Sequence, residues 1–270
     1  MLAIKNNIMA ENAARHLGMS YDALAKSVER LSSGLRINSA KDDAAGLAVR
    51  EEMRSNIAVL QQGSRNALDG ISMLQTMEGA MSTIDEALIR MRQLAEQAAT
   101  GSYSDPQRVI MDEEFAEMAA EINRIAGAIE FNGNKLLNST ATITIQFGGT
   151  TADQVDIEGC DMTSATLGLS TASIATAADA QLALATVANA ITTKDTARAS
   201  FGYKMNRLES VISVVNNQVE NLMAAESRIS DVDVATEMAV MTRTQVLAQA
   251  GVAMLAQANT VPQMALNLLR

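Results

Sequence analysis

The sequence has very few aromatic residues, with no Trp, three Tyr and four Phe among 270 residues. Aromatic and β-branched residues are the usual strand formers, whereas the hydrophobic 48% of this chain is supplied largely by Ala, Leu, Ile, Val and 17 Met. Ala, Leu and Met favour helix over strand. The composition therefore argues against an all-β protein and favours a mainly α fold.

Cysteine and histidine are almost absent, with one residue of each, Cys160 and His16. A single cysteine cannot form an intramolecular disulfide, and the two residues together provide too few ligands for a histidine-based metal site or a catalytic triad. The sequence therefore predicts no catalytic residue, no metal site and no cofactor.

Segments that direct a chain to a membrane or to nucleic acid are also missing. The N-terminus has no charged start followed by an apolar run of about seven residues, so no cleaved secretory signal is predicted. Polar residues such as Arg243 and Gln249 interrupt the longest apolar stretches, so none is long enough to span a bilayer. With 31 acidic against 21 basic residues and no basic patch, the chain is expected to bind neither nucleic acid nor an anionic membrane.

The sequence instead has a strong helical periodicity. Apolar residues recur at alternating three- and four-residue spacing in five segments, as in helices that pack along their whole length. These segments are residues 17–31, 74–95, 111–129, 201–222 and 234–255.

Breaks between the segments lie at matched distances from the two ends. Gly34 is predicted to end the first helix in the left-handed conformation, and Ser39-Ala-Lys-Asp42 resembles a capping box that starts the next helix. Residues 230–233 have the same cap-and-acid spacing. Terminal helices over residues 6–31 and 234–258 are predicted to pair antiparallel, and Pro262 is predicted to stop the second one.

Two longer helices of similar length are predicted between those breaks, over residues 44–99 and 177–226. A shorter helix opens at Pro106 and carries its periodicity to residue 129. Residues 142–147 and 154–157 alternate around a turn, which predicts a single β-hairpin. The predicted fold is mainly α, a long antiparallel helical-bundle rod with one small β-hairpin.

The last 40 residues carry only five charges, and their small and apolar side chains are distributed around the helix. A helix that is apolar on all sides expects to be surrounded. One antiparallel partner cannot surround it, so other copies of the same chain are the expected source of the missing contacts.

Three motifs resemble bacterial flagellins. Residues 30–49 (RLSSGLRINSAKDDAAGLAV) resemble the N-terminal signature of that family, residues 131–137 (FNGNKLL) its turn before a hairpin, and residues 230–270 its C-terminus through the final Leu-Leu-Arg. The resemblance covers roughly residues 1–147 and 176–270. Flagellins commonly insert outer domains after the hairpin, where this chain has only residues 159–176.

The resemblance implies a structural subunit that polymerises into the extracellular flagellar filament for swimming motility. An inner terminal domain of residues 1–38 and 231–270 would line the filament channel, and residues 39–230 would form the core rod domain, with the hairpin near residues 142–157 and no outer domains. The implied partners are further copies of the chain, the flagellar export apparatus, an export chaperone and the filament cap. Export would proceed without a cleaved signal peptide.

The apolar segments and the resemblance together select candidate contacts and a hinge. The candidate assembly contacts of the inner domain are Leu17, Tyr21, Leu24, Val28, Leu31, Met238, Met241, Val252, Leu255, Leu268 and Leu269. The hinge between the terminal and long helices is assigned to Gly34, Asn38, Ser39 and Asp42.

A further implied partner is an animal Toll-like receptor. Flagellins that activate this receptor carry an Arg and a Leu on the long core helix and a Glu on the next helix. Arg90, Leu94 and Glu114 occupy the matching positions, although Met91, Gln93 and Glu96 depart from the family pattern.

Three alternatives remain open from the sequence. A hook-filament junction protein shares the end motifs, but the Val-Pro-Gln and Leu-Leu-Arg ending and the short central region favour flagellin. A helical-hairpin signalling module of the chemoreceptor type would explain the periodicity, but the chain has no membrane segment. An enzyme that uses the acids of residues 112–121 would need a pocket, which a thin rod does not supply.

Overall fold

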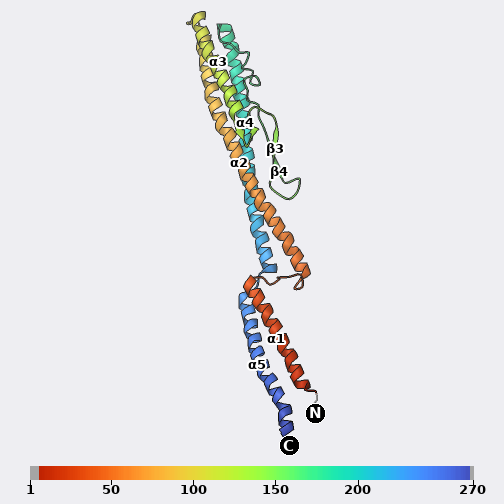
Figure 1. Cartoon of the computed structure of the whole chain (residues 1–270). Helices are drawn as coiled ribbons and strands as arrows, with labels where there is room; N and C mark the ends of the chain where they lie inside the picture. The colour runs from red at the N-terminus through yellow and green to blue at the C-terminus, as the bar shows by residue number, and fades with distance from the viewer. Residues whose placement is uncertain (1–5, 268–270) are drawn as a thin grey trace. The chain divides into compact units, whose positions relative to one another are not determined.

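The computed structural model describes residues 6–267, which form five helices and four short strands. The helices are α1 (Ile8–Ser33), α2 (Ala44–Ala99), α3 (Asp105–Ala128), α4 (Ala177–Ser230) and α5 (Val234–Asn267) (Figure 1). The strands are β1 (Glu130–Phe131), β2 (Asn134–Lys135), β3 (Thr142–Gln146) and β4 (Gln154–Glu158). The predicted mainly α class, with long helices and a β-hairpin, is confirmed.

The chain divides into two compact units. The terminal unit comprises residues 1–55 and 221–270, and the central unit comprises residues 56–220. The division therefore falls inside α2 and α4, whereas the sequence predicted it at the linkers. Polar contacts, described below, also connect the first turns of α2 and the last turns of α4 to the linkers.

In the terminal unit, α1 and α5 run antiparallel side by side (Figure 1). Arg30 near the end of α1 pairs with Glu237 near the start of α5 at 3.5 Å. Leu17 lies against Gly251, where an added Cβ would approach the Leu17 Cδ1 atom to 3.1 Å. Glycine at position 251 therefore lets the two helices approach closely.

The helix ends of the terminal unit are set by Asn7, Gly34 and two aspartates. Gly34 has φ 73°, the predicted left-handed conformation, and its N–H donates to the Arg30 carbonyl. The predicted caps of the next helices are wrong by a few residues. Asp43 caps α2 by accepting from the Gly46 N–H, and Asp233 caps α5 by accepting from the Ala235 N–H.

Pro262 does not stop α5, which continues to Asn267. Proline has no N–H to donate to the carbonyl four residues earlier, which here belongs to Ala258. The Asn7 side-chain Nδ2 donates to that carbonyl instead, at 2.8 Å. The prediction of a stop failed because a side chain of the partner helix satisfies the acceptor that proline leaves free.

The central unit contains the hydrophobic core. The predicted apolar face of α2 is fully confirmed, since all seven of its members from Leu74 to Ala95 are completely buried. Phe115 and Ile122 of α3 and Phe201 and Leu208 of α4 pack into the same core. Sulfur and methyl groups fill the space that aromatic rings occupy in other proteins.

Ion pairs set the antiparallel register of α2 and α4 in the central unit. The Lys194 side chain is 2% exposed and contacts Asp85 as well as Asp195, the latter at 2.8 Å. One turn further along α4, Arg198 pairs with Glu78 at 3.3 Å. An unpaired lysine in this position would be strongly destabilising, so these pairs favour one register over its neighbours.

The predicted hairpin is formed by β3 and β4, which pair antiparallel from Thr142 opposite Glu158 to Gln146 opposite Gln154. It packs on α2 at Gly63, where a side chain would overlap the Phe147 backbone. A second, two-residue ladder between β1 and β2 was not predicted. It forms because Asn132 and Gly133 both have positive φ, as a tight hairpin turn requires.

Candidate assembly surface

The two linkers of the terminal unit pair with each other. The Arg36 N–H donates to the Ser230 carbonyl at 2.6 Å, and the Val232 N–H donates to the Gly34 carbonyl at 3.0 Å. The Arg36 side chain reaches the Ile229 carbonyl at 2.7 Å. The chain segments that leave α1 and enter α5 are therefore joined by backbone hydrogen bonds, and Gly34 takes part in this joint.

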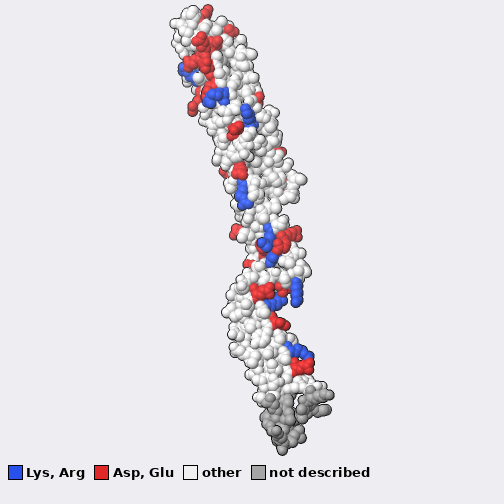
Figure 2. Space-filling model, in the orientation of Figure 1, with Lys and Arg blue, Asp and Glu red and all other residues white. Residues whose placement is uncertain are grey.

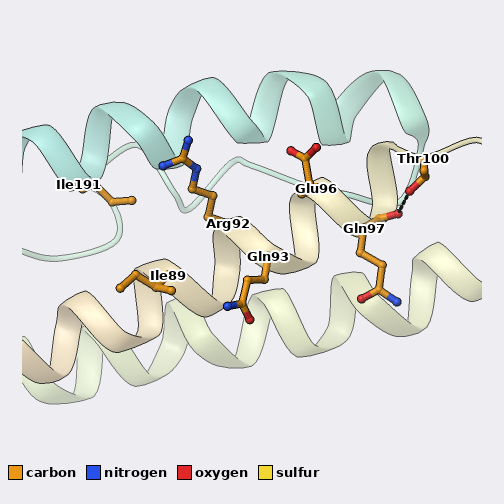
Figure 3. A pocket seen from close by; sticks show the side chains of 7 residues that line it. All are labelled: Ile89, Arg92, Gln93, Glu96, Gln97, Thr100 and Ile191. Atoms are coloured by element: carbon orange, nitrogen blue, oxygen red, sulfur yellow. Dashed lines mark hydrogen bonds between the residues drawn. The ribbon is translucent and has the colours of Figure 1, made fainter.

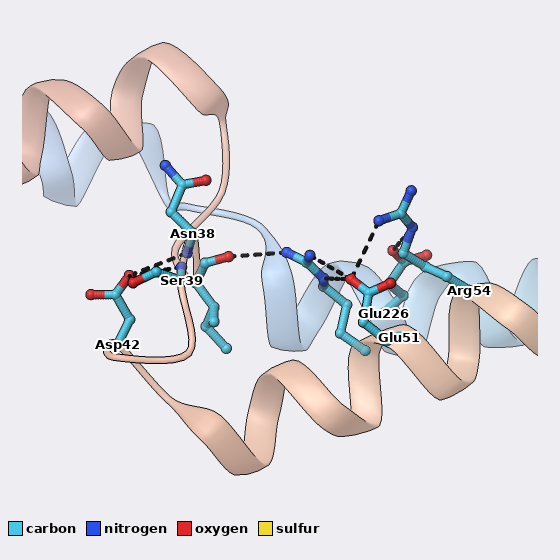
Figure 4. A network of polar contacts seen from close by, with 8 residues as sticks. Asn38, Ser39, Asp42, Glu51, Arg54 and Glu226 are labelled. Carbon is cyan, nitrogen blue, oxygen red and sulfur yellow. Dashed lines mark hydrogen bonds and ion pairs between the residues drawn. The ribbon is translucent and has the colours of Figure 1, made fainter.

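The remaining predicted hinge residues form one turn around a carboxylate (Figure 4). Asp42 Oδ2 accepts from the backbone N–H groups of Asn38 and Ser39 at 3.3 and 3.2 Å, and from the Ser39 hydroxyl. Lys26 Nζ lies 2.6 Å from Asp42 Oδ1. The hydrogen bond from Lys26, together with the backbone donors, lowers the Asp42 pKa to about 2.

A second polar group follows at the start of α2 (Figure 4). The buried Arg50 donates to the Ile37 carbonyl at 3.0 Å and to Glu51 at 2.7 Å. Arg54 bridges Glu51 on α2 and Glu226 on α4. The hydrogen bond from Arg50 lowers the Glu51 pKa. Sequence reasoning missed these residues, although Arg50 and Glu51 directly follow the 30–49 motif.

The interior of the terminal unit is mostly polar. Within residues 6–261, its only buried hydrophobic side chains are Ile37 and Ala248. The other buried residues in this range are polar or charged, namely Ser27, Arg50, Ser230, Glu237 and Thr244. The terminal unit therefore has almost no hydrophobic core of its own.

Large apolar side chains lie on the outside of this unit instead. We call the following thirteen residues, each more than 40% exposed, the terminal apolar set: Ile8, Met9, Met19, Tyr21, Val28, Val49, Met223, Val234, Met238, Val246, Leu247, Val252 and Met254. Figure 2 shows a broad uncharged area over this part of the chain, with few Lys, Arg, Asp or Glu side chains. A surface with this many exposed apolar side chains and few charges is typical of a site that contacts another molecule.

The predicted assembly contacts fall into two groups. The helix pair half-buries Leu17, Leu24, Leu31, Met241 and Leu255. By contrast, Tyr21, Val28, Met238 and Val252 are about half exposed and belong to the terminal apolar set. Leu268 and Leu269 lie outside the described residues.

The central unit places the predicted receptor residues differently. Arg90 and Glu114 form an exposed ion pair at 2.6 Å between α2 and α3. Leu94 is 2% exposed and packs in the core, so it presents no apolar contact at the surface. Receptor recognition stays a prediction.

The central unit also has an open groove of about 600 Å³ beside the predicted receptor residues (Figure 3). Its lining residues are Ile89, Arg92, Gln93, Glu96, Gln97, Thr100 and Ile191. Glu96 is its one carboxylate, and none of the acids of residues 112–121 lines it. A lone exposed acid next to amides does not provide a general acid and base pair.

Neither the cysteine nor the histidine has the surroundings of a reactive group. Burial, followed by the nearby Asp161 charge, raises the Cys160 pKa, which makes its thiol a weaker nucleophile at neutral pH. His16 lies on the exposed side of α1. Within residues 6–267 there is no group of three His, Cys, Asp or Glu side chains that could hold a metal ion. In the same range no helix is long and apolar enough to cross a membrane.

Two family models match most of the chain. The model described as the bacterial flagellin N-terminal helical region matches residues 4–142. The model described as the bacterial flagellin C-terminal helical region matches residues 184–269. The unmatched stretch between them contains all but the first residue of β3, then β4, the following loop and the first turns of α4.

Curated relatives match over the full length of both chains. A flagellin of Halalkalibacterium halodurans is 42% identical, and a flagellar filament 33 kDa core protein of Treponema phagedenis is 41% identical. A flagellin of Bacillus subtilis is 38% identical.

Solved structures of flagellar proteins also match this chain. The crystal structure of Bacillus cereus flagellin matches with a TM-score of 0.52 and 32% identity, over 60% of this chain and 94% of that one. A putative flagellar hook-associated protein from Vibrio parahaemolyticus matches with a TM-score of 0.58 over 70% of this chain and all of that one, but with 14% identity. The second match therefore shows a shared fold and nothing beyond it.

Proposed function

Because the chain belongs to the bacterial flagellin family, and is thus a structural subunit of the extracellular flagellar filament, we propose that its terminal apolar set makes the contacts between copies in that filament. The observation that carries this proposal is the distribution of apolar side chains. Within residues 6–261, the terminal unit buries almost none of its large hydrophobic residues and exposes thirteen. A second copy of the same unit offers the matching apolar surface.

The charge pattern of α5 supports the same proposal. Of its 34 residues, only Glu237 and Arg243 carry a charge, and Glu237 is paired with Arg30 within the unit. Arg243 is therefore the one charged side chain of α5 without a partner among the described residues. A helix with so few charges is not stabilised by exposing all its other sides to water, as it does when α1 alone packs against it.

The free energy available from burying these side chains is sufficient for assembly. Full burial of a Val, Leu, Met or Ile side chain contributes about 1.5–3 kcal/mol. Association costs on the order of 4–15 kcal/mol in lost translational and rotational freedom, before side chains are ordered. These side chains are already about half buried, so covering the exposed part of the whole terminal apolar set would contribute about 10–20 kcal/mol and offset that cost. Each subunit in a filament repeats the contact on several neighbours.

Within the filament, the terminal helices form the inner domain that lines the channel, and residues 39–230 form the core domain without outer domains. The antiparallel α1 and α5 pair and the absence of an insertion between β4 and α4 support this arrangement.

The chain reaches the filament through the flagellum's own export apparatus, with an export chaperone and the filament cap as partners and without a cleaved signal peptide. A narrow export channel requires an unfolded chain. Two features support that route: Cys160 is free, so no disulfide holds the fold, and the α1 and α5 pair is held by few buried apolar groups.

Matched substitutions on the two units test the assembly surface. Val252→Asp places a charge in the terminal apolar set, and Leu182→Asp places the same charge on an exposed leucine of α4 in the central unit. Purified chains are seeded with sheared filaments and pelleted. We expect Val252→Asp to reduce the pelleted polymer at least tenfold, because an unpaired charge is costly to bury.

The Leu182→Asp chain should pellet like the wild type. Both variants should retain the wild-type helix content, measured by circular dichroism, because both positions are exposed. Normal polymer yield from the Val252→Asp chain would show that this surface does not make the contacts.

A further inference from the structure

Exposed and buried methionines are divided between the two units. Among residues 6–261, five methionines are 45% exposed or more, namely Met9, Met19, Met223, Met238 and Met254, and all five belong to the terminal unit. Met9 reaches 70% and Met254 64%. They lie on α1, at the end of α4 and on α5, and all five are members of the terminal apolar set.

The central unit has the opposite pattern. Met73, Met77, Met81, Met91 and Met162 are at most 3% exposed, and all belong to the core. Close-packed interiors leave no path for an oxidant to reach a buried sulfur. The structure therefore holds one set of five methionines open to solvent and one set of five enclosed in the core, apart from the half-buried methionines.

We propose that the five exposed methionines are a reversible oxidation site that controls whether a free subunit can assemble. Methionine thioethers react with peroxides in the two-electron step that gives methionine sulfoxide. The sulfur lone pair attacks one peroxide oxygen and the O–O bond breaks. Sulfur gains that oxygen and is oxidised, while the other oxygen leaves and takes up the protons of the peroxide as water.

The consequence for assembly rests on the proposed function of the terminal apolar set. The sulfoxide replaces a flexible apolar group by a polar S–O group. If that group is enclosed between copies of the chain, it needs a hydrogen-bond donor, and the neighbouring side chains of the set are apolar. An oxidised subunit is therefore excluded from the growing polymer.

The site acts before assembly. In the free subunit the five sulfurs face solvent, whereas contacts between copies would cover them in the filament. Methionine sulfoxide is returned to methionine by reductases of the two sulfoxide epimers, which draw electrons from thiols. Oxidation and repair are then confined to unassembled chains.

The test uses the full-length chain with Cys160→Ser throughout, so that thiol oxidation does not contribute. Monomer is treated with hydrogen peroxide, the peroxide is removed with catalase, and the sample is divided for peptide mass mapping and for seeded polymerisation. We expect each of the five terminal-unit methionines to gain one oxygen, and the five core methionines to remain unmodified. Polymer yield should fall at least tenfold and recover after incubation with methionine sulfoxide reductases.

A chain with all five exposed methionines changed to Leu is the matched variant, because Leu is similar in volume and is not oxidised. Its polymer yield should be the same before and after peroxide. A control chain changed to Leu at the half-buried Met111, Met118 and Met205 of the central unit should remain as sensitive as the parent. If the fivefold variant does not polymerise untreated, the five single variants replace it, and each should lose part of the peroxide effect.

Full assembly of subunits oxidised at all five sites would overturn the proposal, as would an undiminished peroxide effect in the fivefold variant or in all five single variants. These outcomes are distinguishable from failure of the proposed function, which is read without peroxide from the Val252→Asp and Leu182→Asp chains.

Discussion

At the scale of single residues, Asn7 connects two helices by opposite ends of its amide. Its side-chain oxygen accepts from the Ala10 N–H and caps α1, while its Nδ2 donates to the Ala258 carbonyl of α5. That carbonyl is free because Pro262 follows four residues later. The asparagine thus satisfies one unpaired donor and one unpaired acceptor.

Replacement of Asn7 by Asp separates the two roles. Asp keeps the capping oxygen but loses the donor toward Ala258, so we expect the terminal unit to lose about 0.5–1.5 kcal/mol of opening free energy. In a Pro262→Ala background the helix supplies the missing N–H, and the cost of Asn7→Asp should fall to below about 0.5 kcal/mol. Native-state hydrogen exchange of α1 amides measures both values. Simple additivity of the two substitutions would contradict the role given to Asn7.

Residue-scale features were predictable where one residue alone determines the backbone. Gly34 was such a case, because a glycine after a helical segment favours the left-handed helix end. The caps at Asp43 and Asp233 were not, since Ser39 and Ser230 fit the same pattern and only the backbone decides between them. The prediction that Pro262 stops α5 was wrong because the effect of this proline depends on Asn7, which lies 255 positions earlier in the sequence.

At the scale of elements, the sequence predicted the long helices closely and the buried face of α1 only in part. The bounds of α2 are those predicted, because its apolar spacing is unbroken and its core face is chemically uniform. In α1 the predicted Leu17, Leu24 and Leu31 lie on the buried side together with Ser20 and Ser27, whereas the predicted Tyr21 and Val28 are about half exposed. Small polar residues such as Ser20 and Ser27 give no hydrophobic signal, so the periodicity missed them and selected Tyr21 and Val28 in addition to the three leucines.

The linker between α1 and α2 makes a pH prediction. The Asp42 pKa is lowered to about 2 from 3.8, chiefly by the hydrogen bond from Lys26. A carboxylate with a depressed pKa contributes stability that is fully present above its unfolded pKa and is lost as pH falls through the folded pKa. We expect the wild type to melt at a higher temperature than Asp42→Asn at pH 7.

This advantage in melting temperature should stay constant down to about pH 4 and shrink between about pH 4 and 2. Melting followed by circular dichroism over that range gives the difference directly. Asp43→Asn is the matched control, because the neighbouring residue keeps its cap role as Asn. A difference between wild type and Asp42→Asn that persists unchanged at pH 2 would contradict the role of the Asp42 charge.

At the scale of the whole molecule, the two units distribute their apolar residues in opposite ways. The central unit encloses Met, Leu, Ile and Ala around α2, and the terminal unit encloses mainly polar groups while its large apolar side chains face outward. The low charge of the last 40 residues predicted this difference from the sequence. Which side chains face outward could not be predicted, because that depends on the α1 and α5 pairing.

The most direct test is the structure of the polymer itself, determined by electron cryomicroscopy of filaments grown from this chain. The distribution of apolar residues predicts that most of the terminal apolar set, including Val246, Leu247, Val252 and Met254, lies within about 4.5 Å of side chains from neighbouring copies. A filament in which these side chains face solvent and contact no other copy would contradict the assembly surface proposed for the terminal unit.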